Sequence, residues 1–263
     1  MISSILKSFG LILRNPLLLL PALLAGIANS IIIELLKENL IELLVRWSSQ
    51  GFFPVTEIEA PFYFVAVNLN LFLIVLLGIF FMFIVNGITV FAYAEYIKEK
   101  QQNNAGVLKA LINSWKKIPR IALITLFFAM IALMLAVFFS LSIAISATLD
   151  IIGLIFALII ILLSIYLAIK FAFTLTVMGF EETNVKESLK KTWEFSRKHS
   201  IEIIFFLIIL SVITALLAQL GVFLLSLTQN EWILILIPII ITLIVSSFSN
   251  LAFAIYYSSK QNA

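Results

Sequence analysis

Polar and charged residues interrupt several long apolar runs of the chain, and they are the first candidates for chemistry. They are Asn29, Asn86, Lys170, Glu202, Gln219 and Asn250. An unpaired polar group inside a membrane is costly, so it usually faces other protein or a water-filled cavity. Lys170 and Glu202 have similar expected depths in successive runs, and we hypothesise an ion pair between them. Alternatively, the Lys170 ammonium reaches the headgroups and the amides hydrogen-bond between helices, or these residues form a polar route or small ligand site.

Catalytic and metal-binding patterns are absent from the sequence. His199 is the only histidine and there is no cysteine, so the usual zinc site cannot form. There is no HExxH, G-x-S-x-G or P-loop lysine motif, and Glu202 has no acidic neighbour on the inner side of its run. The sequence therefore predicts a protein that is not an enzyme and that uses no metal and no cofactor.

The elements that carry these residues are apolar runs long enough to cross a membrane. The chain is 63% hydrophobic and only 12% charged, about half of the charged share of a soluble domain. Crossing a hydrocarbon layer of about 30 Å takes roughly 20 helical residues, and the alternating strands of a barrel are missing. We expect an all-α integral membrane protein with kinks at Pro21 and Pro238. Its six transmembrane helices are predicted at residues 16–36, 64–94, 118–146, 151–178, 200–227 and 232–257.

Basic residues indicate the orientation of these helices. With the N-terminus in the cytoplasm, every lysine and arginine except Lys37 and Arg46 falls on or near the inner face. We therefore expect a multi-pass protein of the cell membrane with both termini cytoplasmic. Its inner basic residues should attract anionic lipid headgroups. The net charge of +3 does not imply nucleic acid as a partner, because the orientation already explains the basic residues.

Three copies of one pattern run through the chain. Each copy places a small hydroxyl residue and then an aromatic residue before a long apolar run. These pairs are Ser8 and Phe9, Ser114 and Trp115, and Thr192 and Trp193. The copies also end alike, in FAYA from Phe91, FAFT from Phe171 and LAFA from Leu251. We infer three tandem repeats, about 1–100, 104–180 and 183–259, within a single membrane domain. A cleaved signal peptide ending near Ala28 is the competing interpretation, but cleavage would destroy the first repeat.

A short amphipathic helix is expected to open each repeat, ahead of a transmembrane hairpin. In residues 185–198, Val185, Leu189 and Trp193 share one face, and charged residues take most of the rest. Such a helix should lie in the membrane interface, with its aromatic residue at headgroup depth. It is either a structural elbow that sets the entry angle of the next helix or a place for partner docking or lipid sensing. On the opposite side, the loop with Pro54 and Pro61 is the expected place for an extracytoplasmic contact.

Two segments carry a resemblance to a known family. They are NVKESLKKTWEFSRKHSIEIIFFLIIL from Asn184 and its earlier copy GVLKALINSWKKIPRIALITLFF from Gly106. The chain resembles bacterial and archaeal multi-pass proteins related to the membrane domain fused to some glycerophosphodiester phosphodiesterases. The resemblance implies a membrane domain of six or more helices without an established activity. The acidic and histidine active site of the phosphodiesterase barrel has no counterpart in this sequence.

Two functions from different classes fit these observations. The first is a non-enzymatic membrane module that interacts with lipid or serves as the membrane partner of another protein. Small residues at every fourth position from Ala132 to Thr148 would also allow a homo-oligomer. The second is a transporter or channel with a pathway between the repeats, built from the polar residues of the apolar runs. The interfacial helices and the scarcity of buried charge favour the first function.

Overall fold

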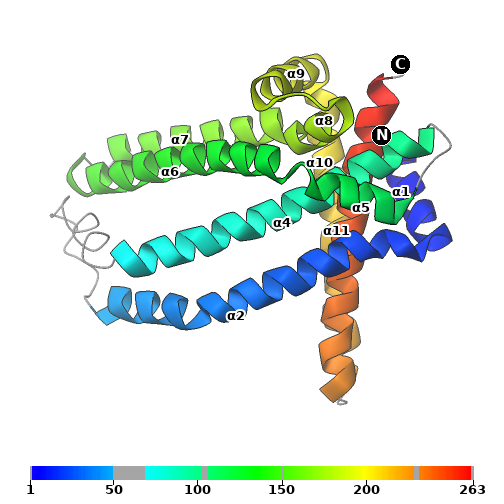
Figure 1. Ribbon diagram of the computed structural model, residues 1–263. Helices are drawn as coiled ribbons and strands as arrows, with labels where there is room; N and C mark the ends of the chain where they lie inside the picture. The colour runs from blue at the N-terminus through cyan, green and yellow to red at the C-terminus, as the bar shows by residue number, and fades with distance from the viewer. Residues whose placement is uncertain (1, 50–68, 102–105, 150, 228–230, 262–263) are drawn as a thin grey trace. The chain divides into compact units, whose positions relative to one another are not determined.

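The computed structural model describes residues 2–49, 69–101, 106–149, 151–227 and 231–261, which form helices joined by short turns, with no strand among them (Figure 1). The chain begins with a short helix, α1 (Ile2–Arg14), and a 3-10 turn, η1 (Pro16–Leu19). The other helices are α2 (Leu20–Ser49), α4 (Leu69–Gln101), α5 (Val107–Trp115), α6 (Ile118–Leu149), α7 (Ile151–Phe171), α8 (Thr174–Glu181), α9 (Val185–Lys198), α10 (Ser200–Ser226) and α11 (Glu231–Gln261). The predicted outer loop with Pro54 and Pro61 lies outside the described residues.

Six helical stretches in the described part of the chain are long and apolar enough to cross a membrane, as the sequence predicts. They are Pro16–Leu43, Leu69–Gln101, Ile118–Phe139, Ile151–Glu181, Ser200–Ser226 and Leu236–Gln261. Their large apolar side chains are widely exposed, with Leu154 and Leu216 as examples. A water-soluble protein rarely exposes apolar surface so continuously, whereas hydrocarbon accommodates it. The protein therefore has the all-helical build of a multi-pass membrane protein.

Two details of the predicted helices are corrected. The fourth predicted helix, 151–178, is interrupted, because α7 ends at Phe171 and α8 begins at Thr174. At this break, the Thr174 hydroxyl donates to the Phe171 carbonyl at 2.8 Å and competes with regular helical bonding. Pro21 lies in the first turn of α2, where its missing N–H costs nothing, so it marks a helix start rather than a kink. Pro238 lies inside α11, as expected.

The chain divides into two compact units, and their boundaries fall within the long helices. Unit 1 comprises residues 1–27, 86–121 and 169–263, and unit 2 comprises residues 28–85 and 122–168. Within unit 2, α2 and α4 approach closely at Gly78, where an added Cβ would meet the end of the buried Leu36 side chain. Small residues permit such close contact between membrane helices.

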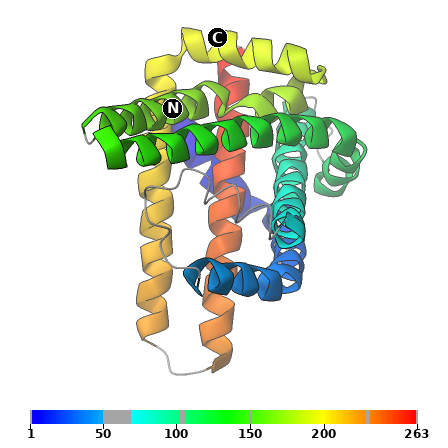
Figure 2. The ribbon, with the colours of Figure 1, turned by 90° about the vertical axis from the view of Figure 1, so that its left-hand side faces the viewer.

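An aromatic cluster fills the centre of unit 1. The ring of Phe173, at the break between α7 and α8, lies 4.9 Å from Phe253, 5.6 Å from Tyr256 and 6.0 Å from Phe206, measured between centroids. Tyr256 of α11 stacks on Phe206 of α10 at 4.6 Å. These two helices run side by side in opposite directions (Figure 2). Aromatic pairs of this kind add about 0.5–1.5 kcal/mol each beyond their buried area.

Candidate functional site

The three short helices α1, α5 and α9 each turn a hydroxyl residue towards protein. Ser8, Ser114 and Thr192 are all buried. Ser8 Oγ donates to the Ile5 carbonyl and Ser114 Oγ to the Leu111 carbonyl, each at 2.6 Å, and Thr192 Oγ1 donates to the Ser188 carbonyl at 2.7 Å. Because each hydroxyl is satisfied within its own helix, it can be buried without a partner on another element. These predicted elbow residues therefore form the packed side of their helices.

The aromatic residues that follow these hydroxyls do not behave alike. Trp115 is 55% exposed and Trp193 is 38% exposed. Phe9, in contrast, stacks on Phe248 of α11, with ring centroids 4.1 Å apart. The ring of Phe9 therefore packs against protein, and its expected place at the membrane interface stays a prediction.

Each short helix contacts a neighbouring helix of unit 1. For α1 the neighbour is α11, through Phe9 and Phe248. For α5 it is α4, since Lys109 Nζ lies 3.0 Å from the buried carboxylate of Glu99. For α9 it is α8, where Lys191 forms an ion pair with Glu181. Side chains of α11, α4 and α8 thus hold the short helices in place.

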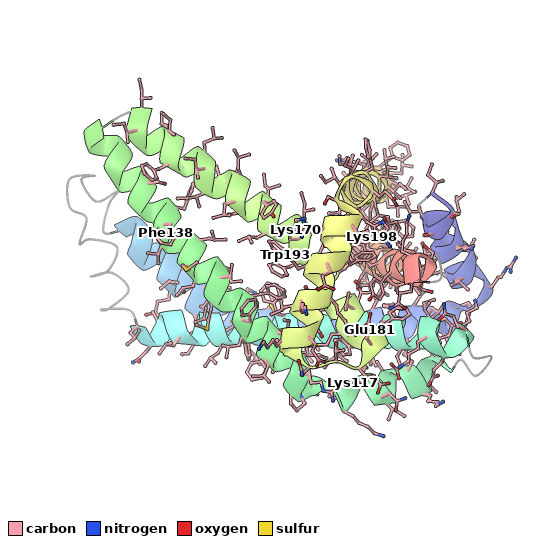
Figure 3. All side chains as sticks on the ribbon, turned by 90° about the horizontal axis from the view of Figure 1, so that it is seen from above. Lys117, Phe138, Lys170, Glu181, Trp193 and Lys198 are labelled. Atoms are coloured by element: carbon pink, nitrogen blue, oxygen red, sulfur yellow. The ribbon has the colours of Figure 1, made fainter. Side chains whose placement is uncertain are left out.

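Lys170 is a buried cation with protein partners. Its Nζ lies 5.5 Å from the centroid of the Trp193 ring and donates to Ser200 Oγ at 3.4 Å. Its carbonyl accepts from the buried Ser196 hydroxyl at 2.8 Å. Figure 3 shows Lys170 and Trp193 side by side. A cation over an indole face is stabilised by the ring quadrupole, most strongly away from water, so Lys170 ties α7 to α9.

Glu202 binds a different cation. Lys260 Nζ, near the end of α11, lies 2.6 Å from Glu202 Oε2, and the Tyr256 hydroxyl donates to the same oxygen at 3.2 Å. His199 Nδ1 lies 3.6 Å from Glu202 Oε1. The hypothesised pair of Lys170 with Glu202 is thus replaced by separate contacts, because the last helix supplies the cation.

The three amides of the predicted polar site lie on different helices. Asn86 is exposed on α4, Gln219 is exposed on α10, and Asn250 is half-buried on α11. For none of them does the geometry indicate a reaction. Over the described residues, no group of three or more histidine or acidic side chains has the arrangement of a metal site.

Sequence reasoning missed a set of carboxylates at the helix ends. Glu181 accepts from Lys191, from the Tyr257 hydroxyl and from Gln261 Nε2, and so joins α8, α9 and α11. Glu95, also buried, pairs with Lys117 at 3.2 Å. The only sequence signal for these pairs is acidic residues among the basic residues that set the orientation, and it does not specify partners.

Two exposed groups next to this set have shifted pKa values. The Lys98 ammonium donates to Glu182 Oε1 at 2.7 Å, and this hydrogen bond is the main reason that the pKa of Glu182 is lowered from 4.5. The Glu181 carboxylate, which accepts from Lys191, raises the pKa of that lysine above 10.5. Both shifts favour the charged forms and so the ion pairs themselves.

A cavity of about 590 Å³ opens among α1, α4 and α11. Leu6, Lys7, Gly10, Leu11, Arg14, Ile97, Lys100, Gln101 and Ile255 line it. Its size is that of a small-molecule site. It combines three cations with an apolar wall, whereas the sequence assigned these cations only to the inner face.

No protein-family model, no curated protein and no solved structure matches this chain.

Proposed function

We propose that this protein is a non-enzymatic multi-pass module of the cell membrane, with both termini cytoplasmic, that binds anionic lipid at its cytoplasmic side. The observation that carries the proposal is the outward face of the short helices. Trp115 and Trp193 are both well exposed, and exposed cations such as Lys116 and Arg197 accompany them. An indole beside cations suits the boundary between headgroups and acyl chains.

The three tandem repeats belong to this proposal, as does the relation to the membrane domain of glycerophosphodiester phosphodiesterases. The equal burial of Ser8, Ser114 and Thr192 supports the repeats. Two of the repeat ends agree at their third residue, since Tyr93 and Phe173 are both fully buried in unit 1, whereas the equivalent Phe253 is half-buried. Three similar units would bring three short helices to one face of the membrane, which makes that face the expected contact for lipid or a partner protein.

Depth-dependent fluorescence quenching tests the interfacial position. Single-tryptophan variants that keep only Trp115 or only Trp193 are reconstituted with phospholipids brominated near the headgroup or near the end of the acyl chain. We expect stronger quenching by the shallow bromines for both variants. Quenching of both indoles only by the deep bromines, or by neither lipid, would contradict the proposal.

Lipid selectivity is measured on the same protein by native mass spectrometry after gentle extraction. Retention of anionic phospholipid over phosphatidylcholine is the expected result. A retained protein or a second copy of this chain in place of lipid would instead favour the partner-binding form of the module. Ion or solute flux in liposomes, abolished by changing Asn86 and Asn250, would favour the transporter.

A further inference from the structure

The cavity among α1, α4 and α11 gathers three cations from two helices that are far apart in the sequence. Lys7 and Arg14 come from α1, and Lys100 comes from the end of α4. Arg14 is close enough to Lys100 for the two positive charges to repel each other. Like charges brought together in a folded protein disfavour each other unless an anion lies between them.

Other lysines of unit 1 have carboxylate partners. Lys98 pairs with Glu182 at 2.7 Å, and Lys117 with Glu95 at 3.2 Å. In contrast, no acidic side chain of the described ranges forms an ion pair with Lys7, Arg14 or Lys100. The three cations that line the cavity are therefore available to an external anion.

Helix dipoles explain only part of this arrangement. Arg14 lies in the last turn of α1 and Lys100 in the last turn of α4, where a cation is favoured by the negative end of the helix. Lys7 lies in the middle of α1 and gains nothing from that effect. The dipoles also do not require that the two helix ends converge on one cavity.

The walls of the cavity are apolar, and one of them is open at a glycine. Leu6, Leu11 and Ile97 contribute side chains to the lining, and Ile255 adds another from α11. A Cβ added to Gly10 would meet no other atom within 4 Å, so the absence of a side chain there leaves the space empty. Gln101 is held by its hydrogen bond to Ser258 Oγ at 2.6 Å. The cavity thus suits a ligand with an anionic end and an apolar end.

We propose that this cavity binds the phosphate group of an anionic amphiphile, with the phosphate among Lys7, Arg14 and Lys100 and the apolar part against Leu11, Ile97 and Ile255. Phosphate fits because guanidinium and ammonium groups are its usual partners in proteins. The proposal rests on the lipid-binding function above and names its ligand class. A phospholipid headgroup and a soluble phosphate ester share this chemistry, and the experiment separates them.

The test uses the full chain in a neutral detergent and follows bound mass by native mass spectrometry. The probes are dioctanoyl phosphatidylglycerol, dioctanoyl phosphatidylcholine and sn-glycerol 3-phosphate, each added over a concentration series. We expect one phosphatidylglycerol to bind per chain, with at least tenfold preference over phosphatidylcholine. Equal occupancy by the two lipids, or phosphatidylglycerol bound only in increasing numbers without a first site, would overturn the proposal.

A charge variant and a matched control assign the site. The variant Lys7→Gln, Arg14→Gln, Lys100→Gln should lower the affinity for phosphatidylglycerol by tenfold or more. The control Lys186→Gln, Lys190→Gln, Lys198→Gln removes the same number of charges from the exposed side of α9, outside the cavity, and should change it less than threefold. Both variants lose three positive charges, so the general attraction of the basic surface to anionic lipid falls equally in the two. Only a specific site in the cavity would make their affinities for phosphatidylglycerol differ. Equal losses in the two variants would refute a site in the cavity.

Filling the cavity tests the site without changing any charge. Gly10→Leu places an apolar side chain in the open space and replaces a poor helix former, so the fold should be retained. We expect loss of the bound phosphatidylglycerol while Trp193 is still quenched by shallow brominated lipid. Binding that survives Gly10→Leu would contradict the proposal and leave the interfacial function intact. Binding of sn-glycerol 3-phosphate at the affinity of the lipid would support the phosphate site and identify a soluble ester as its ligand.

Discussion

Replacing Tyr93 by phenylalanine removes one oxygen atom from the centre of unit 1 and leaves the ring in place. Tyr93 is fully buried on α4, and its hydroxyl oxygen lies 2.8 Å from the Leu18 carbonyl oxygen and 2.8 Å from Ser247 Oγ. The phenol has one proton and the carbonyl can only accept, so the Ser247 hydroxyl donates to Tyr93 when Tyr93 donates to Leu18. One oxygen therefore links α4, η1 and α11.

The expected loss of stability follows from the groups left behind. A buried acceptor or donor that loses its partner costs about 1–3 kcal/mol, and both Tyr93 and Ser247 are fully buried. The Ser247 hydroxyl can turn to a carbonyl of its own helix, as Ser249 does with Val245, which limits its share. We therefore expect Tyr93→Phe to cost about 1–3 kcal/mol, or roughly 5- to 150-fold in the unfolding equilibrium.

Unfolding in mixed micelles of dodecyl maltoside and dodecyl sulfate, followed by tryptophan fluorescence, measures this cost. A double-mutant cycle with Ser247→Ala supplies the control, because both changes break the same contact. The double variant should lose less stability than the sum of the single variants. A loss below about 0.5 kcal/mol for Tyr93→Phe, or strict additivity in the cycle, would refute the reasoning.

Three further predictions concern other parts of unit 1. Gly179→Leu should destabilise by about 1–3 kcal/mol or prevent folding, since even a Cβ at Gly179 would lie 2.8 Å from the Ala94 Cβ; the same unfolding assay, with Gly10→Leu as control, checks this. Glu182→Gln should cost less than about 1 kcal/mol at pH 7, because the Lys98 pair is partly exposed. Since the folded pKa of Glu182 lies below 4.5, that contribution is present above pH 4.5 and is lost as the pH falls through the folded pKa; a difference in stability between parent and variant that does not shrink as the pH falls below 4.5 would disagree. Glu182 is also the one described residue other than glycine with positive φ, at 54°, so Glu182→Gly should relieve backbone strain and offset much of the lost ion pair in the same titration.

The sequence predicts the class of the fold because length and apolar composition decide it. Runs of about 20 or more apolar residues have few alternatives to a membrane helix, and all six predicted helices are found. The sequence does not indicate the break at Phe173, since residues 151–178 are apolar apart from Lys170 and a few hydroxyl residues, and hydropathy carries no information about a local change in backbone angles. The sequence predicts a kink at Pro21, but Pro21 lies in the first turn of α2. A proline is tolerated in the first turn and kinks a helix only in its interior, and the sequence does not show where this helix starts.

The site was predictable only as far as local periodicity reaches. The buried hydroxyls of Ser114 and Thr192 follow from the amphipathic spacing of their own helices. Glu202, in contrast, pairs with Lys260 of α11. The expected depth of Glu202 in the membrane does not identify this partner, because several cations have a similar expected depth. The cavity was not predictable from local periodicity either, because Arg14 and Lys100 approach one another only after α1 and α4 have packed. Side chains that meet across long sequence separations depend on tertiary packing, which one sequence does not reveal.

The contact between α1 and α11 has a consequence for the synthesis and membrane insertion of the protein. α1 leaves the ribosome well before α11, on which Phe9 stacks. Until α11 has been inserted, Phe9 lacks the Phe248 ring on which it stacks, and this part of the apolar side of α1 stays uncovered. A chain that stops before Phe248 would therefore lack the ring on which Phe9 stacks, and the uncovered apolar side of α1 would make such an incomplete copy susceptible to proteolysis.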